Sequence, residues 1–472
     1  MKNKGIILIC NKAIMVTALL AFVTTMIGAV PLPDTFSNAA HHSQALSPAS
    51  ILDKASPPSA KKQKEGKLTE GIMQVAISDI EAAIRKKKEE SDEPFIILIG
   101  GKSCSGKTTQ IAQVLAKHFS CNVLEMDMYY LGRTYMREHG YDSFDIPQVF
   151  DLGLLVENIR QLRNRQTARI PVYSFLTKER QGYTDLPPAD VLIIEGMFGL
   201  DDQLAEQGDY CLFIDIGKIG QLLRRMYKEV IIGRTGHTFR HEIRQLLTQV
   251  IPSEKEYIEP TRKNADVIVH NEYNPEVESA LLPYTEVQAK INSVNLPAGR
   301  LTELGARQLA ETQHIDTYYV PIDTDLAQNG ETLMIREEDQ EMSLTYKGPL
   351  IPSELQYRTR LNLPFERDLL PFVHLDYKPV AKIRKTRTTY KLNELIIHLD
   401  HVETLGDFIE ITTPEPANAG DRDTILELLR TLGISQDRII KKTYLDLMLE
   451  KTPWTETRPS TGERSSGVPS SA

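Results

Sequence analysis

The chain has 472 residues, of which 25% are charged and 41% hydrophobic, the usual mix of a globular protein. That length is too great for one ordinary hydrophobic core, so two or three domains are expected. The formal net charge of −9 argues against nucleic-acid binding along the whole chain, and no nucleic-acid partner is predicted. The four cysteines lack CxxC or metal-like spacing, which excludes a disulfide framework.

Residues 1–37 have the pattern of a secretory signal or a membrane anchor. Three lysines precede an apolar run at about residues 13–30, and small residues at 37–39 (SNA) then offer a cleavage site. The apolar run is nearly long enough to span a membrane. A start codon placed too far upstream is the alternative explanation. Membrane attachment is therefore one prediction, and the location of the chain stays open.

The next segments predict a linker, a lead-in helix and an α/β domain. Residues 38–66 are rich in Ser, Pro, Ala and Lys, which is typical of a flexible linker. Apolar residues at helical spacing predict a helix within residues 67–94. Over residues 95–275, helical patterns separate short, continuously apolar segments, which are residues 94–100, 191–194 and 210–214. This alternation predicts a doubly wound parallel sheet.

The pattern changes after about Tyr273. Over residues 280–451, short segments of alternating polarity, for instance at 286–290, 342–347 and 395–399, predict a mostly antiparallel β domain. Residues 452–472 are rich in Ser, Pro, Gly and Thr and are predicted to be disordered.

A phosphate-binding loop is predicted at residues 101–108. Their sequence, GKSCSGKT, fits the pattern G-x-x-x-x-G-K-[ST] between a predicted strand and a predicted helix. The glycines let backbone N–H groups and the helix N-terminus face an anion. Lys107 can bridge the β- and γ-phosphates of ATP, and the Thr108 hydroxyl can ligate Mg²⁺. The residues predicted to bind ATP here are Gly101, Lys102, Ser103, Cys104, Ser105, Gly106, Lys107, Thr108 and Thr109.

Two carboxylates follow predicted strands of the same domain. Asp127 comes after the apolar segment 122–126, and Glu195 comes after 191–194. In open α/β sheets, ligands bind beyond the carboxyl ends of the strands. Either carboxylate could activate a substrate hydroxyl or hold the metal through water.

Six segments together resemble the uridine kinase and phosphoribulokinase family, which has the P-loop NTPase fold. In chain order they are residues 100–109, 127–130 (DMYY), 143–151 (SFDIPQVFD), 170–173 (IPVY), 194–196 (IEG) and 258–266 (IEPT followed by AD). The resemblance implies an ATP- and Mg²⁺-dependent kinase in which Lys107 and Asp127 are catalytic, with Asp127 as general base. It also implies that Glu195 supports Mg²⁺ together with Thr108.

The same resemblance implies an acceptor pocket and a basic lid. Asp145 would contact a sugar hydroxyl, Tyr173 would lie near the acceptor, and Arg225 and Arg234 would close over the phosphates with Arg224 and Lys228. Uridine kinases usually carry His where this chain has Lys178. Lys178 beside Arg180 would suit an anionic acceptor, because a cation replaces a neutral ring.

Segments of the C-terminal domain resemble the CYTH domain, the triphosphate tunnel fold. They are residues 286–290 (EVQAK), 313–319 (QHIDTYY), 333–336 (LMIR), 344–349 (LTYKGP), 385–387 (KTR), 399–402 (LDHV), 408–410 (FIE) and 442–447 (KTYLDL). A closed barrel lined by alternating cations would concentrate positive field on a polyphosphate. The predicted lining residues are Glu286, Lys290, Arg336, Lys347, Arg358, Arg360, Lys385, Arg387 and Glu410.

At two positions the chain departs from the CYTH pattern in a way that affects hydrolysis more than anion binding. Gln288 stands where the opening motif usually has Glu, and Thr412 stands where a second acid is common. An amide is a poor ligand for Mg²⁺ compared with a carboxylate. We therefore expect the tunnel to bind pyrophosphate or other polyphosphates, with hydrolysis there in doubt.

Three functions follow from these patterns. The first is an ATP/Mg²⁺-dependent kinase for a small-molecule hydroxyl, with a polyphosphate-binding CYTH domain. The second is a pyrophosphate or triphosphate phosphohydrolase with a regulatory P-loop domain, and the third is a non-catalytic nucleotide or polyphosphate sensor. Kinase chemistry favours the cytoplasm, where ATP is available, whereas the N-terminal segment favours a membrane.

Overall fold

The computed structural model describes residues 63–68, 70–119, 121–233, 236–274, 278, 285–292, 298–322, 330–351, 353–413 and 420–451. The signal-like segment, most of the predicted linker, the C-terminal tail and Arg234 lie outside these residues. Among the helices that the structure describes, none is both long and apolar enough to cross a membrane.

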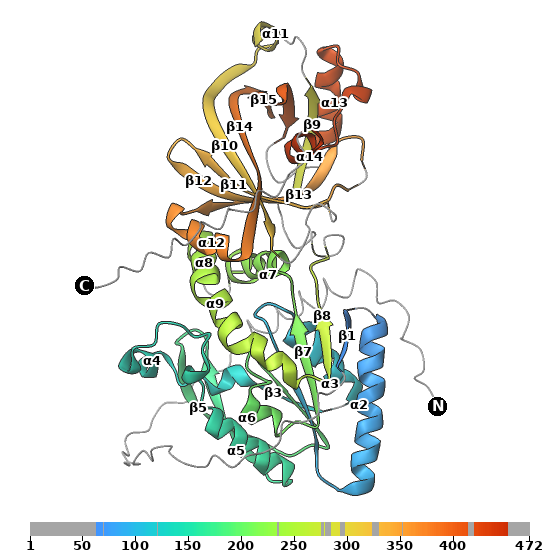
Figure 1. The fold of residues 1–472 in the computed structure, drawn as a ribbon, viewed down its shortest axis with the longest axis vertical. Helices are drawn as coiled ribbons and strands as arrows, with labels where there is room; N and C mark the ends of the chain where they lie inside the picture. Colours follow the sequence, from blue (N-terminus) through green and yellow to red (C-terminus); the bar gives the residue numbers. More distant parts are fainter. Residues whose placement is uncertain are drawn as a thin grey trace, which may run out of the picture. The chain divides into compact units, whose positions relative to one another are not determined.

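The first domain is built on a parallel sheet of six strands in the order β1-β8-β7-β2-β6-β3 (Figure 1). Its strands are β1 (Lys64–Lys67), β2 (Phe95–Gly101), β3 (Asn122–Glu125), β6 (Val191–Glu195), β7 (Tyr210–Asp215) and β8 (Val267–His270). All five pairings are parallel. The predicted doubly wound α/β fold is confirmed.

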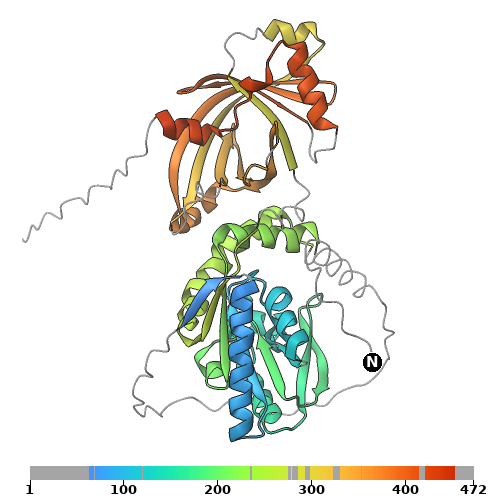
Figure 2. The same ribbon diagram turned by 90° about the vertical axis from the view of Figure 1, so that its right-hand side faces the viewer.

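Both faces of this sheet are covered, which explains why its central strands are apolar throughout. Ile96 and Leu98 of β2 pack in one core cluster with α5 (Leu152–Arg163). Ile97 and Ile99 point to the opposite face and pack with α2 (Glu70–Glu90) and α3 (Gln113–Phe119). Figure 2 shows α2 running along the sheet.

The structure corrects the end of the predicted linker. We expected flexible chain up to Gly66, but β1 (Lys64–Lys67) pairs in parallel with β8. Its sequence, KEGK, has no apolar pattern, and backbone pairing holds it at the sheet edge together with ion pairs of Glu65 with His270 and Arg262 and of Lys64 with Asp79. An edge strand tolerates such charges because only one side is paired.

Shorter elements carry the chain between the strands of this domain. The antiparallel hairpin of β4 (Ala168–Ser174) and β5 (Glu179–Leu186) follows α5. The remaining helical segments are η1 (Lys107–Ala112), η2 (Met126–Tyr129), α4 (Arg133–His139), η3 (Pro147–Val149), α6 (Asp202–Ala205), α7 (Lys218–Arg225), η4 (Met226–Ile231), α8 (Phe239–Gln245), η5 (Leu246–Val250), α9 (Ile251–Ser253), η6 (Glu254–Ile258) and η7 (Glu259–Asn264).

The second domain is a closed antiparallel barrel in the order β10-β11-β12-β13-β9-β16-β15-β14. Its strands are β9 (Thr285–Asn292), β10 (Arg307–Pro321), β11 (Thr332–Glu338), β12 (Glu341–Lys347), β13 (Gln356–Phe365), β14 (Tyr377–Leu392), β15 (Leu395–Val402) and β16 (Gly406–Thr412). All eight pairings are antiparallel, which confirms the predicted barrel.

Alternation along β9 separates the interior of the barrel from its apolar exterior. Glu286, Gln288 and Lys290 line the interior cavity, whereas Val287 and Ala289 lie in an outer hydrophobic cluster. That cluster includes residues of α13 (Asp421–Thr431), which covers the strand. The other helical segments of this domain are α11 (Ala298–Glu303), η10 (Arg367–Leu369), α12 (Leu370–Asp376), η11 (Gln436–Arg438) and α14 (Tyr444–Lys451).

Candidate functional site

Three neighbouring strands of the parallel sheet end at one edge. The phosphate-binding loop follows β2, Glu195 is the last residue of β6, and Asp127 follows β3 within η2. Because β2, β6 and β3 are adjacent in the sheet, their carboxyl ends lie side by side. The fold therefore brings the loop and both predicted carboxylates together.

The loop has the backbone geometry that its glycines predict. Gly101 has φ +130°, and a Cβ atom there would lie 2.1 Å from the Ile214 carbonyl oxygen. Gly106, with φ +85°, precedes the helical turn of η1 in the left-handed region. The buried Lys107 ammonium donates to the carbonyl oxygens of Gly101 (3.0 Å) and Lys102 (2.6 Å), and burial lowers its pKa.

Thr108 and Glu195 form an oxygen-rich site beside Lys107. The Thr108 hydroxyl donates to Glu195 Oε1 at 2.8 Å. Burial raises the pKa of Glu195 to about 7, against the opposing effect of Lys107. A carboxylate and a hydroxyl are ligands that suit Mg²⁺, and a nearby divalent cation would favour the ionised carboxylate. The residues present therefore fit the implied metal.

The Asp127 carboxylate acts electrostatically both on the metal-site residues and on residues predicted to contact the acceptor. Its charge raises the pKa of Glu195, Asp145 and Tyr173 and acts on Lys107. Within the described residues, no hydrogen bond or ion pair occupies the Asp127 carboxylate. A half-buried carboxylate without a partner is suited to accept a substrate proton.

The acceptor side contains three of the four predicted residues. Asp145 is buried, and burial raises its pKa while Arg225 opposes the shift. The Tyr173 ring lies 5.2 Å from that of Tyr130, centroid to centroid. Lys178 Nζ lies 5.3 Å from the ring centroid of Phe144, the residue that precedes Asp145 in the chain.

The structure gives Arg180 partners within the protein, and its contact with the acceptor stays a prediction. Its guanidinium donates to the carbonyl oxygens of Tyr130 (2.9 Å) and Tyr129 (2.9 Å) and to Asp151 Oδ2 (3.1 Å). Arg180 therefore holds the segment after Asp127 in place. Sequence spacing placed it near the pocket but could not show that backbone carbonyls use its donors.

Arg225, which was predicted to belong to the lid, has side-chain partners on α8. Its Nε donates to Glu242 Oε2 at 2.7 Å, and its Nη2 donates to Gln245 Oε1 at 3.0 Å. The influence of Arg225 on Asp145 shows that it lies near the acceptor side. Its contact with phosphates, like that of Arg234, stays a prediction.

Glu254 and Gln221 support the loop but were missed from the sequence. Glu254 Oε1 accepts from the Ser103 backbone N–H at 2.8 Å, and Gln221 donates to the Ser103 carbonyl oxygen at 3.1 Å. Burial raises the pKa of Glu254 to about 7. They lie far from residues 101–108 in the chain, and no motif marked them.

All nine predicted tunnel residues line one cavity inside the barrel. Seven of them are cations, and Gln288 and Thr412 line the same space. The cavity is about 40 Å³, room for only a few water molecules. A polyphosphate could therefore enter only if side chains that now meet across the tunnel separate.

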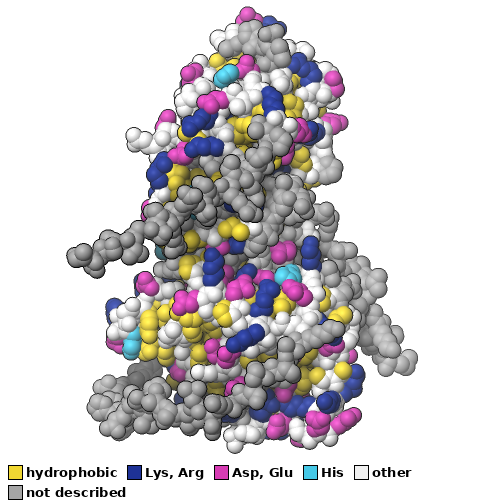
Figure 3. Space-filling view, in the orientation of Figure 1, with side chains coloured by type: hydrophobic (Ala, Val, Ile, Leu, Met, Phe, Trp, Pro, Cys, Tyr) yellow, Lys and Arg dark blue, Asp and Glu magenta, His cyan; other side chains and the backbone are white. Residues whose placement is uncertain are grey.

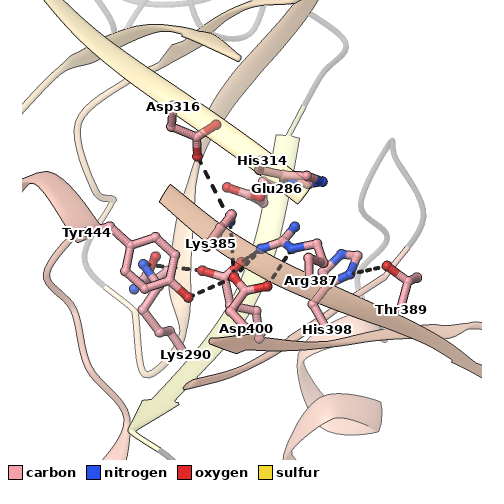
Figure 4. A network of polar contacts seen from close by, with 12 residues as sticks. Glu286, Lys290, His314, Asp316, Lys385, Arg387, Thr389, His398, Asp400 and Tyr444 are labelled. Atoms are coloured by element: carbon pink, nitrogen blue, oxygen red, sulfur yellow. Dashed lines mark hydrogen bonds and ion pairs between the residues drawn. The ribbon is translucent and has the colours of Figure 1, made fainter. Parts of the chain in front are cut away.

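Carboxylates inside the barrel pair with most of these cations (Figure 4). Asp400 accepts from Lys385 (3.0 Å), Arg387 (2.6 Å) and the Tyr444 hydroxyl (2.9 Å). Glu410 bridges Arg387 (2.5 Å) and Lys290 (3.3 Å).

Two further carboxylates pair with cations on the other strands. Glu286 meets Lys347 (3.2 Å) and Arg360 (3.0 Å), and Asp316 binds Arg336 through both oxygens at 2.7 and 2.8 Å. Asp316, Asp400 and Tyr444 were not among the predicted site residues. All three lie in segments that resemble the CYTH domain, but the sequence did not show which side chains they would meet.

Arg358 differs from the other tunnel cations. It is 1% exposed, its Nη2 donates to Gln356 Oε1 at 2.6 Å, and its Nε has no partner among the described residues. The Gln288 Oε1 atom in the same cavity is also unpaired there. An unsatisfied buried donor is costly, so an anion that reaches Arg358 would relieve that cost.

Burial and neighbouring cations lower the pKa of two tunnel lysines. The pKa of Lys347 falls to about 7, chiefly through burial, with Arg360 and Arg358 adding repulsion that Glu286 offsets. Burial and Arg387 lower the pKa of Lys385 to about 8. Both lysines are therefore partly neutral near physiological pH.

On the outer surface, charges of both signs are interspersed. Figure 3 shows Lys and Arg side chains among Asp and Glu side chains over the face drawn. The face drawn has no such dense group of cations as the seven Lys and Arg side chains that line the barrel cavity.

Comparison with known proteins agrees with both parts of this geometry. Residues 96–278 match the model described as Phosphoribulokinase / Uridine kinase family, and residues 283–444 match that of the CYTH domain. The Uridine kinase of Macrococcus caseolyticus is 34% identical over 180 residues, which are 37% of this chain and 86% of that protein. This chain belongs to the phosphoribulokinase and uridine kinase family.

Two longer relatives match across both domains of this family member. Uridine-cytidine kinase C of Dictyostelium discoideum is 26% identical over 384 residues, 78% of this chain and 80% of that protein. Inorganic pyrophosphatase TTM2 of Arabidopsis thaliana is 24% identical over 368 residues, 77% of this chain and 52% of that protein. The chain is thus a kinase with an ATP-binding P-loop domain and a CYTH domain, as the motifs predicted.

Lys347→Arg should weaken the pH dependence of polyanion binding in the tunnel. A bound anion favours the charged lysine, so above about pH 7 binding must take up a proton, and affinity falls as pH rises. An arginine stays charged, so the fall between about pH 6.5 and about pH 8.5 should be smaller. Titration calorimetry with tripolyphosphate measures this, and comparison with wild type cancels the ionisation of the ligand. An equal fall in both proteins would contradict the assignment.

Proposed function

We propose that residues 95–275 transfer the γ-phosphate of ATP to a hydroxyl of a small molecule, with Mg²⁺ as the metal. The observation that carries this proposal is the meeting of Lys107, the Thr108–Glu195 pair and Asp127 at three adjacent strand ends. Each supplies one part of phosphoryl transfer: a phosphate clamp, a metal site and a proton acceptor.

The residues would share the reaction as follows. Lys107 would hold the β- and γ-phosphates, while Thr108 and Glu195 would hold Mg²⁺. When bound, Mg²⁺ neutralises charge that develops on the transferred group. Asp127 would accept the proton of the attacking hydroxyl, because its carboxylate has no partner in the described structure. Asp145 would orient the acceptor through a second hydroxyl.

Asp127→Asn should lower kcat about 100-fold or more while ATP affinity changes little, because an amide cannot accept the proton. Release of ADP by the full-length chain gives kcat, and equilibrium binding gives the ATP affinity. Asp142→Asn, an exposed carboxylate on the same stretch of chain, is the matched control and should be neutral. A large loss of ATP affinity would instead assign Asp127 to the metal site.

The acceptor that we propose is anionic. The two kinase relatives above are named for uridine or for uridine and cytidine, yet Lys178 brings an ammonium group to the ring of Phe144, which precedes Asp145 in the chain. A cation at this position stabilises an anionic group, such as a sugar phosphate, more than a neutral base.

Lys178→His should shift the acceptor profile from sugar phosphates towards uridine and cytidine. The change restores the residue type that uridine kinases usually carry and removes a fixed charge. Initial rates against a panel of nucleosides and sugar phosphates measure the shift. Lys117→His, at an exposed position of α3, should leave the profile unchanged. If the profile of Lys178→His matches that of wild type, the lysine does not contact the acceptor.

For the CYTH domain we propose polyphosphate binding without efficient hydrolysis. The seven cations, and the unpaired Arg358 Nε among them, support binding. Hydrolysis needs a metal to position water, and Gln288 supplies an amide where a carboxylate would hold it. The named activity of the Arabidopsis relative makes pyrophosphate hydrolysis the second candidate function.

Gln288→Glu should raise release of phosphate from pyrophosphate or tripolyphosphate in the presence of Mg²⁺ or Mn²⁺, because it adds a metal ligand inside the tunnel. Gln313→Glu, exposed on β10, is the matched control and should have no effect. Brisk hydrolysis by wild type that Glu410→Ala abolishes would make the phosphohydrolase the first candidate. A chain that neither phosphorylates an acceptor nor hydrolyses a polyphosphate would be a sensor.

A further inference from the structure

A cluster of two histidines and one glutamate lies at the N-terminal end of α8, and none of the three was predicted to take part in phosphoryl transfer. Ligand atoms of His237, His241 and Glu242 all lie within 4.8 Å of one another. The two imidazole rings are 4.1 Å apart, centroid to centroid, and His237 Nδ1 lies 2.6 Å from Glu242 Oε1. Two nitrogens and one oxygen that converge in this way are the donor set of many zinc sites.

The local backbone explains why these residues meet. His241 and Glu242 belong to α8, and His237 comes immediately before its cap residue, Thr238. The Thr238 hydroxyl accepts from the His241 backbone N–H at 3.3 Å. This cap turns the chain so that His237 faces the side chains of the first helical turn.

Arg225 holds the carboxylate in the orientation that a metal needs. It donates to Glu242 Oε2, and Gln245 in turn accepts from Arg225. Glu242 Oε1 remains directed at the imidazoles. A second group that orients a carboxylate ligand is a regular feature of metal centres.

Burial and charge also suit an ion with one open position. Glu242 is 1% exposed, whereas His241 is exposed, so an ion can enter from solvent and keep a water ligand. Burial, His237, Lys178 and Arg225 lower the pKa of His241, and Glu242 opposes the shift. The same cations repel an ion, which predicts moderate affinity.

We propose that His237, His241 and Glu242 bind one Zn²⁺ or a similar borderline divalent ion, with water as the fourth ligand. The ion would take the place of the proton between His237 and Glu242. It would tie the segment before α8 to the helix and fix Glu242, the partner of Arg225. Through the hydrogen bond of Glu242 with Arg225, an ion here would act on the predicted lid without contacting phosphates.

The test is metal binding by the full-length chain, and it does not depend on kinase activity. Protein stripped with a chelator is titrated with Zn²⁺ in a competition assay, and with Co²⁺, whose visible spectrum reports tetrahedral coordination. Wild type should bind one ion more than either His237→Ala or His241→Ala does. The chain has 11 histidines, so His118→Ala, an exposed histidine of α3, is the control for weak surface binding.

His241→Gln tests the same site with less risk to the fold, since it keeps a similar volume and removes the imidazole. Circular dichroism of each variant confirms folding. Loss of one Zn²⁺ and of the tetrahedral Co²⁺ spectrum in the His237 and His241 variants, with both retained in His118→Ala, would support the site. Equal binding by wild type and the His241 variants, or an octahedral Co²⁺ spectrum in wild type, would overturn it.

Discussion

Inside the barrel, Asp400 stands between Lys385 and Arg387, and Glu410 extends the network to Lys290. These charges are out of contact with water, where an unpaired ion costs several kcal/mol. Carboxylates from other strands of the closed barrel meet six of the seven cations in its interior, and Arg358 alone among the seven has an amide partner instead. A ligand that replaces those carboxylates must bring comparable negative charge, as the proposed polyphosphate would.

The same constraint acts in the kinase domain, with fewer charges. Lys107 is buried against two carbonyl oxygens, and Glu195 is buried against a hydroxyl, so the pKa of each moves toward the neutral form. Bound phosphate and metal would reverse both shifts. The loop and the tunnel are alike in that each holds buried charge, which the proposed ligands would stabilise further.

Much of the fold followed from periodicity and motifs. Continuous apolar runs gave the buried parallel strands, and alternation in residues 286–290 identified the side of β9 that faces the tunnel. The loop and the two carboxylates after β3 and β6 followed from motif and strand order. The edge strand β1 did not follow, because KEGK has no pattern that distinguishes a strand from a linker. The partners of Arg180 did not follow either, because a basic residue near a predicted pocket gives no sign of which carbonyls it will meet.

By itself, the sequence determined the classes of the two domains, the phosphate loop and the set of cations that line the barrel. The tertiary structure alone decided which charges meet: Asp316 with Arg336, Asp400 with Arg387, and Glu242 with both Arg225 and His237. The physical reason is that a period of two residues places side chains on a face, whereas strand register and helix packing set which partner lies opposite. The partner that lies opposite a buried charge shifts the pKa of that group, and a ligand that binds there must replace the partner.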